Sequence, residues 1–183
     1  KGGEVVVVTV GPERAQAALR TGLAMGADSA IHVKDAALDA TDALGTARAL
    51  AAAIRTLGPV DLVLCGQQGV GGDHSQIPGM LAELLDLPRA AVVTKLDYSG
   101  AGTAVVDREL EGGLVDRVEV DTPAVLTIQT GINEPRYANL RAIKQAEQVE
   151  ITVRSAAAGG QPADRVRRMF VPDRGEGAEM IDG

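Results

Sequence analysis

Short apolar runs alternate with amphipathic stretches along the first half of the chain. Residues 5–10 form a continuous β-branched run, which is typical of a strand buried on both faces of a parallel sheet. Pro12 suits the first position of a helix, and apolar residues recur at helical spacing over residues 15–23. Gly26 is a favourable helix stop, and a second short apolar run follows at residues 30–33.

The same cycle then repeats. A helical stripe covers residues 44–57, a strand-like run covers residues 60–65, and a second helical stripe covers residues 77–85. A glycine-rich loop, residues 66–73, separates the last two. Strands alternating closely with helices predict right-handed βαβ crossovers. We therefore expect an α/β fold with a doubly wound, Rossmann-type parallel sheet.

The pattern changes after Pro88. Four segments are strand-like: residues 91–98, 103–108, 114–120 and 123–128. Turn-forming glycines separate the first from the second and the second from the third, which predicts an added β-hairpin region. Beyond Asn133 the apolar signal weakens, and residues 155–161 are small and glycine-rich. We expect a nucleotide-binding domain over residues 1–148 and an extended C-terminal arm over residues 149–183, which needs a partner surface to become ordered.

Charge and composition exclude several classes of function. The 183 residues carry 18 Lys and Arg against 25 Asp and Glu, a net charge of −7, which disfavours binding to nucleic acid or an anionic membrane. Two tyrosines and one phenylalanine form no base-stacking platform. One cysteine and two histidines support neither a disulfide framework nor a transition-metal site. Without a membrane-spanning run or a basic leader, we expect a soluble protein of a reducing compartment.

The glycine-rich loop is the main candidate for ligand binding. It lies where a strand's carboxyl end meets a helix, and its backbone N–H groups together with the helix N-terminus suit a phosphate. It lacks the Walker lysine and the G-x-G-x-x-G spacing, so a simple tight turn remains an equal alternative. Asp73 would repel a phosphate in direct contact and serves better as a helix cap, a role open also to Ser75, while Pro78 suits the first turn.

Other reactive residue types have ordinary explanations. Cys65 follows a buried strand and is expected to be an inert core thiol. His74 fits an exposed loop histidine, and His32 lies near a strand end with no serine, cysteine or carboxylate partner to recruit it. Glu109 and Glu111 fit a solvated turn. No set of acid, base and nucleophile supports a hydrolase or transferase.

Three stretches resemble the β subunit of the electron transfer flavoproteins. Residues 23–33 resemble the family's second βα unit, and residues 64–76 resemble its adenine nucleotide loop. The most specific stretch is residues 106–127, with Arg108, the Glu111-Gly-Gly113 turn and a Pro-Ala-Val-Leu-Thr run. The Asn-Glu-Pro-Arg-Tyr run at residues 133–137 is also typical.

The resemblance implies an adenine nucleotide hydrolase-like fold and a heterodimer with an α subunit. That α subunit holds FAD, while the β subunit contains a structural AMP. Electrons would come from acyl-CoA or other flavin dehydrogenases and pass to a quinone oxidoreductase, in the cytoplasm of a bacterium or archaeon or in a mitochondrial matrix. The chain would be an electron-carrier subunit rather than a self-sufficient enzyme. The implied nucleotide contacts are Val10, Gly66, Gln67, Gln68, Gly69, Val70, Gly71, Gly72, Asp73, His74, Ser75, Gln76 and Ile77.

The resemblance also implies a docking segment for partner dehydrogenases. Arg136, Tyr137 and Leu140 would form it, with Leu140 as the apolar anchor. The alternative is that Leu140 begins a short helix and packs against its own domain. The arm would then wrap the α subunit.

Some positions depart from the family pattern. Gly71 and Gly72 stand where acids or Asp-Gly are usual, Ile77 and Pro78 replace a small polar residue and glycine, and Asp116 replaces Glu or Gln. The family's opening strand and its closing helix are not found, so a fragment is expected.

Two other functions remain open at this stage. A bifurcating flavoprotein would hold a second FAD in place of AMP and oxidise NADH, and the Pro-Asp-Arg-Gly run at residues 172–175 resembles that branch slightly. A stand-alone nucleotide-binding stress-type protein shares the expected sheet topology, but the unburied arm disfavours it.

Overall fold

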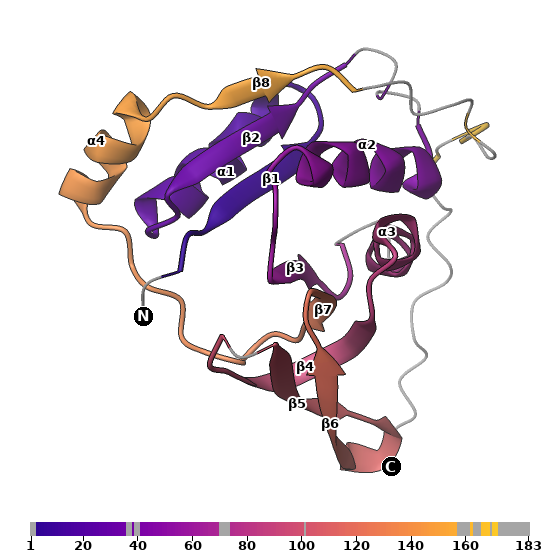
Figure 1. Ribbon diagram of the computed structural model, residues 1–183. Helices are drawn as coiled ribbons and strands as arrows, with labels where there is room; N and C mark the ends of the chain where they lie inside the picture. The colour runs from indigo at the N-terminus through magenta and orange to yellow at the C-terminus, as the bar shows by residue number, and fades with distance from the viewer. Residues whose placement is uncertain are drawn as a thin grey trace, which may run out of the picture.

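Two β-sheets carry the fold, and helices pack against them (Figure 1). The computed structural model describes residues 3–35, 38, 41–69, 74–100, 102–156, 162, 166–168, 170 and 171. Within these residues the structure is mixed α/β, as the alternation of apolar runs predicts.

The first sheet has three parallel strands in the order β1-β2-β8. β1 (Val6–Val10) leads through the 3-10 turn η1 (Glu13–Ala15) into α1 (Gln16–Ala24), and the chain returns as β2 (Ser29–Val33). β8 (Thr152–Arg154) pairs with the other side of β2. The predicted βαβ unit is confirmed, although the α-helix begins four residues after Pro12, which instead precedes η1.

The second sheet has five strands in the order β3-β7-β4-β5-β6. β3 (Leu62–Gly66), β7 (Ala124–Ile128) and β4 (Arg89–Tyr98) run parallel. β5 (Thr103–Glu109) and β6 (Val115–Asp121) extend the sheet as an antiparallel meander. The predicted hairpin region is therefore present and belongs to the same sheet as β3.

Two further helices, α2 (Ala43–Arg55) and α3 (Ile77–Leu85), pack against each other. α2 has an alanine-rich face, and α3 meets it where Ala51, Ile54 and Leu81 form one buried cluster. Asp42 begins α2, because its Oδ1 accepts a hydrogen bond from the N–H of Gly45 at 2.7 Å.

The fourth helix, α4 (Leu140–Gln148), is amphipathic and lies against α1. Ala146 packs into the cluster that contains Leu19 and Leu23. Arg20 of α1 donates from its Nη1 to the carbonyl oxygens of Ala146 and Val149, both at 2.5 Å. The Ala146 carbonyl also accepts from the N–H of Val149 at 3.3 Å, so Arg20 adds a second bond there and fastens the end of α4 to α1.

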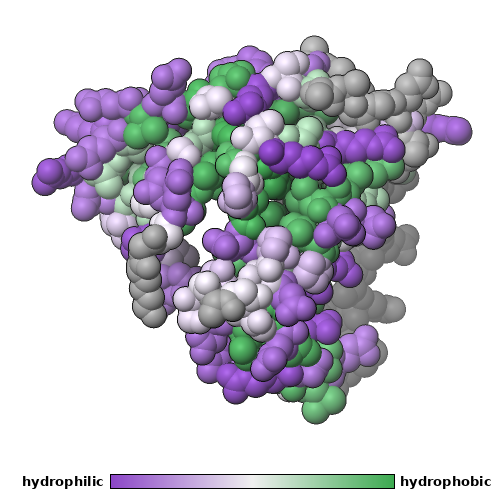
Figure 2. Space-filling view, in the orientation of Figure 1, coloured by the Kyte–Doolittle hydropathy of each residue, from purple (hydrophilic) through white to green (hydrophobic). Residues whose placement is uncertain are grey.

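The structure differs from the expected single parallel sheet. β1 ends one sheet and β3 ends the other, and in the described chain each pairs on one side only. Figure 2 shows an opening in the surface between the part with the three-stranded sheet and the part with the five-stranded sheet. As a result Val6–Val10 are half-buried throughout rather than buried on both faces, and Leu64 in β3 is 57% exposed. Apolar periodicity identifies strands but not their neighbours, which explains the difference.

The expected C-terminal arm begins with ordered structure. Ile151 is buried beside α1, β8 pairs with β2, and the N–H of Lys34 donates to the carbonyl of Arg154 at 2.9 Å. Among the later described residues, Val166 and Phe170 are exposed, and the Arg168 guanidinium stacks on the Phe170 ring at 5.0 Å. Ala156, just after β8, still packs against the core, and the docking of the arm on a partner surface stays a prediction.

Candidate functional site

The glycine-rich loop connects the carboxyl end of β3 to α3. Gly66 ends the strand, Gln67, Gln68 and Gly69 follow it, and Ile77 begins the helix. The predicted contacts Val70, Gly71, Gly72 and Asp73 lie outside the described residues. The other loop residues in the predicted set, His74, Ser75 and Gln76, are exposed and lie directly before the helix.

The described glycines of this loop leave open space. A Cβ built on Gly66 or on Gly69 would meet no atom within 4 Å, and neither residue has the left-handed backbone that requires glycine. Neither packing nor backbone geometry in the described chain therefore explains these two glycines. Both lie at the carboxyl end of a parallel strand, where a small side chain lets a ligand approach the backbone, so the residues present fit a phosphate.

The start of α3 differs from the prediction at one point. Gln76 is the N-cap residue and makes no capping hydrogen bond with its side chain, while Ser75 has φ of 51°. Ser75 is therefore not the cap, and Asp73, the other candidate, lies outside the described residues. Pro78 stands in the first turn as expected. Within the described residues no side chain caps the first N–H groups of the helix, so those present can meet an anion, although Pro78 contributes none.

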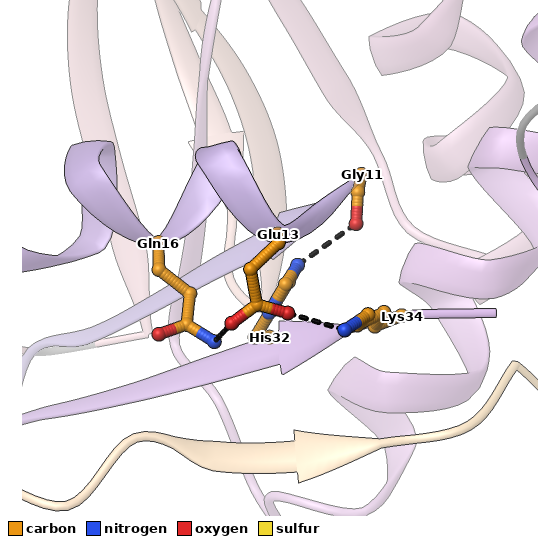
Figure 3. A network of polar contacts seen from close by, with 5 residues as sticks. All are labelled: Gly11, Glu13, Gln16, His32 and Lys34. Atoms are coloured by element: carbon orange, nitrogen blue, oxygen red, sulfur yellow. Dashed lines mark hydrogen bonds and ion pairs between the residues drawn. The ribbon is translucent and has the colours of Figure 1, made fainter.

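Val10 ends a strand of the other sheet, so the predicted site draws on two sheets. The turn after Val10 is held by β2. The N–H of Gly11 donates to the carbonyl of Val33 at 3.2 Å, and His32 Nε2 lies 2.8 Å from the carbonyl oxygen of Gly11 (Figure 3). Because a carbonyl only accepts, Nε2 carries the proton. His32 is thus a buried structural residue, although sequence reasoning gave it no partner.

Charged side chains border the same turn. Glu13 accepts a hydrogen bond and forms an ion pair with Lys34, and it also accepts one from Gln16 Nε2 at 2.7 Å (Figure 3). The hydrogen bond and the charge of Lys34 lower the pKa of Glu13 below its ordinary value. Both charges are exposed to solvent, so this pair adds little stability to the turn.

A buried polar contact at the start of the loop was not predicted from the sequence. Thr127 of β7 is 2% exposed and donates its hydroxyl proton to Gln67 Oε1. It also accepts from the N–H of Val92 at 2.8 Å. Val92 has φ of 57°, a conformation that costs a β-branched residue about 1–3 kcal/mol. A contact of this kind joins three strands and leaves no signal in spacing or composition.

The remaining reactive residue types have no catalytic arrangement in the described chain. Cys65 is half-buried, and burial raises the pKa of its thiol, as expected for an inert cysteine. Glu109 and Glu111 are exposed. The described residues contain no group of three or more His, Cys, Asp or Glu side chains placed to hold a metal ion.

The predicted docking segment is exposed. Tyr137 is 96% exposed and Leu140 is 79% exposed, while Arg136 is exposed and lies with its guanidinium against Gly26. Leu140 begins α4, and Asn139 caps it by accepting from the N–H of Ala142 at 2.9 Å. Leu140 begins a short helix, as the alternative explanation expected, and within the described residues its side chain is exposed, so its docking role stays a prediction.

A separate cavity of about 300 Å³ lies between α2 and the carboxyl ends of β2 and β8. It is lined by Val33, Ala49, Ala52, Ala53, Thr56, Arg154 and Ser155. None of these residues belongs to the glycine-rich loop. None of the helices in the described chain has the length and apolar character needed to cross a membrane.

Comparison with known proteins agrees with the architecture of this region. The model of the electron transfer flavoprotein domain matches residues 1–158. The electron transfer flavoprotein subunit beta of Methylophilus methylotrophus is 45% identical, over 98% of this chain and 71% of its own length. The subunit of the same name from Mycobacterium tuberculosis is 38% identical, in a match that covers 90% of this chain and 61% of that relative.

A third relative comes from a named complex. The caffeyl-CoA reductase-Etf complex subunit CarD of Acetobacterium woodii is 37% identical over all of this chain and 72% of its own length. The domain match and these identities agree with the resemblance seen in the loop and hairpin residues. The chain belongs to the electron transfer flavoprotein family and is related to its β subunits.

Proposed function

We propose that this chain acts as the β subunit of a heterodimeric electron transfer flavoprotein. The FAD, bound mainly by an α subunit, would supply the electron-carrying chemistry. Electrons would come from acyl-CoA or other flavin dehydrogenases and go to a quinone oxidoreductase. The match to the electron transfer flavoprotein domain and the relationship to β subunits support this proposal.

The β subunit would bind AMP at the glycine-rich loop. The observation that carries this proposal is the open space at Gly66 and Gly69, where a Cβ would meet nothing within 4 Å. Backbone N–H groups of the loop and of the uncapped start of α3 would receive the phosphate. The bound nucleotide would be structural, since it would support assembly rather than carry electrons.

The exposed start of α4 would receive the dehydrogenase partners. Leu140 and Tyr137 present apolar and aromatic surface, and Arg136 adds a positive charge. An exposed leucine surrounded by polar residues suits a small, transient interface with one apolar anchor. Several partners can use such an anchor, because a single leucine needs only an apolar pocket in each of them.

A bifurcating flavoprotein is the second candidate, favoured by the relationship to CarD of the caffeyl-CoA reductase-Etf complex. In that case a second FAD would occupy the place of AMP and would react with NADH. The open glycine corner suits either molecule, because both carry phosphate next to an adenosine group.

Extraction of bound nucleotides tests these proposals. The full-length protein would be purified together with its partner flavoprotein chain, and the released nucleotides would be identified by absorbance and mass. One FAD and one AMP per heterodimer support the carrier, and two FAD support the bifurcating form. A nucleotide found on a protein that recruits no flavoprotein chain would favour the stand-alone alternative, and the absence of any nucleotide would contradict all three.

A further inference from the structure

Strand β4 is irregular at Val92. Its register with β7 shifts between Ala90 and Val93, and its register with β5 shifts between Val93 and Lys95. Val92 lies inside this bulge with a left-handed backbone, which is rare for a β-branched residue. The bulge takes the N–H of Val92 out of the regular ladder, so this donor needs another acceptor.

Thr127 supplies that acceptor from β7. Its Oγ1 accepts from the N–H of Val92 at 2.8 Å, and the side chain is almost completely buried. Its own hydroxyl proton then needs an acceptor, and Gln67 Oε1 receives it. One hydroxyl therefore serves the strained bulge on one side and the first side chain of the glycine-rich loop on the other.

These contacts fix the orientation of the Gln67 amide. Because Oε1 must face the Thr127 hydroxyl proton, Nε2 is turned away from Thr127. Within the described residues Nε2 has no hydrogen-bond acceptor, and Gln67 is half-buried directly after Gly66. The two N–H groups of Gln67 Nε2 are thus left for another acceptor.

We infer that Thr127 is a positioning residue for the nucleotide site, holding Gln67 so that its Nε2 donates to a phosphate or ribose oxygen. The inference rests on the proposed function, which places the nucleotide at this corner. Phosphate oxygens and ribose hydroxyls both accept hydrogen bonds, so either can receive the two N–H groups. The bulge at Val92 secures Thr127 from the opposite side, because rotation of its hydroxyl away would leave the Val92 N–H unpaired.

Binding measurements on the complete complex test the inference. The nucleotide would be removed, and AMP and adenosine would be titrated separately by calorimetry. We expect Gln67→Leu to weaken AMP binding about tenfold, the loss of one hydrogen bond to a charged or polar oxygen. Equal losses for AMP and adenosine assign the contact to ribose, and a loss confined to AMP assigns it to phosphate. Unchanged binding of both overturns the inference.

A double-mutant cycle separates positioning from general stability. If Thr127 acts through Gln67, Thr127→Val combined with Gln67→Leu binds no more weakly than the weaker single variant, and Thr127→Ser restores binding. Fully additive losses contradict the inference. Thr94→Val is the matched control, since Thr94 also lies in the bulged part of β4 and its hydroxyl donates to the carbonyl of Asp107 at 3.2 Å.

A variant that fails to fold is distinct from a folded variant that binds the nucleotide weakly. Thr127→Val leaves the Val92 N–H unpaired and can prevent folding, but Gln67→Leu and Thr127→Ser leave that bond intact and still decide the question. A wild-type complex that binds neither AMP nor FAD contradicts the proposed function itself. A wild-type complex that binds AMP, but no more tightly than the Gln67→Leu variant, contradicts the inference about Gln67 and Thr127 and leaves the proposed function standing.

Discussion

His32 holds the carbonyl group of Gly11 from a fully buried position, with Nε2 2.8 Å from the oxygen. The other ring nitrogen, Nδ1, is buried and has no partner in the described chain. The histidine thus gives up one hydrogen-bonding site in order to fix the turn after β1. Val10, a predicted nucleotide contact, directly precedes this turn.

Removal of the His32 imidazole should destabilise the fold. His32→Phe leaves the Gly11 carbonyl without its donor, and we expect the free energy of unfolding to fall by about 1–3 kcal/mol in urea titrations. His32→Gln, which restores a donor, should lose less. The exposed His74 is the control, and His74→Phe should change stability by less than about 0.5 kcal/mol. Equal stability of His32→Phe and wild type would show that the contact carries no energy.

Valine at Gly66 or Gly69 should remove the nucleotide without unfolding the protein. The structure offers space for the new side chain at both positions, so the valine would occupy the place of the ligand. The measurement is the nucleotide content of the purified complex together with its thermal stability in the apo form. Gly3→Val is the matched control, because Gly3 also has open space but lies outside the loop. A full nucleotide content in both loop variants would refute the proposed site.

Leu140→Ala should slow electron transfer from a dehydrogenase and leave the fold unchanged. Leu140 is 79% exposed, so its truncation removes contact with a partner rather than core packing. Hot-spot residues of this kind are worth about 2 kcal/mol, which corresponds to about a thirtyfold change in affinity. Stopped-flow reduction of the flavin measures the effect. Leu114→Ala, a substitution of another exposed leucine, should keep the wild-type rate.

The thiol of Cys65 should react slowly with a disulfide reagent in the folded protein. Burial raises the pKa of this thiol, so less of the reactive thiolate is present at pH 8 than in an exposed cysteine. The labelling rate should rise as the pH increases toward the raised pKa, and unfolding in urea should remove the protection. Folded protein that labels as fast as unfolded protein would contradict the assignment of Cys65 as inert.

Element types could be predicted from the sequence because local patterns decide them. The apolar stripe of residues 77–85 corresponds to α3, and the largely apolar run of residues 123–128 corresponds to β7. The site could be predicted in part, since the glycines follow a strand and precede a helix. Gln76 took the cap position expected of Ser75 or Asp73, because the left-handed backbone at Ser75 places it outside the helix.

Other features depend on contacts between distant residues. β8 has only three residues, too few for their alternation to predict a strand, and its pairing with β2 makes it one. The bulge at Val92 and its bond to Thr127 join positions 35 residues apart. The separation of β1 from β3 likewise depends on which strands become neighbours. No local pattern contains this information, so such features lay beyond prediction from a single sequence.

The hydrogen bonds from Arg20 to the end of α4 help to fix the orientation of the helix that begins with Leu140. A partner bound at the first turn of α4 contacts a helix whose C-terminal end is held against α1 by Arg20. The C-terminal end of this helix is therefore fixed, through α1, to the part of the molecule that contains the three-stranded sheet. Replacing Arg20 would release this end, so the anchor could still be recognised but would lose its fixed angle to the rest of the molecule.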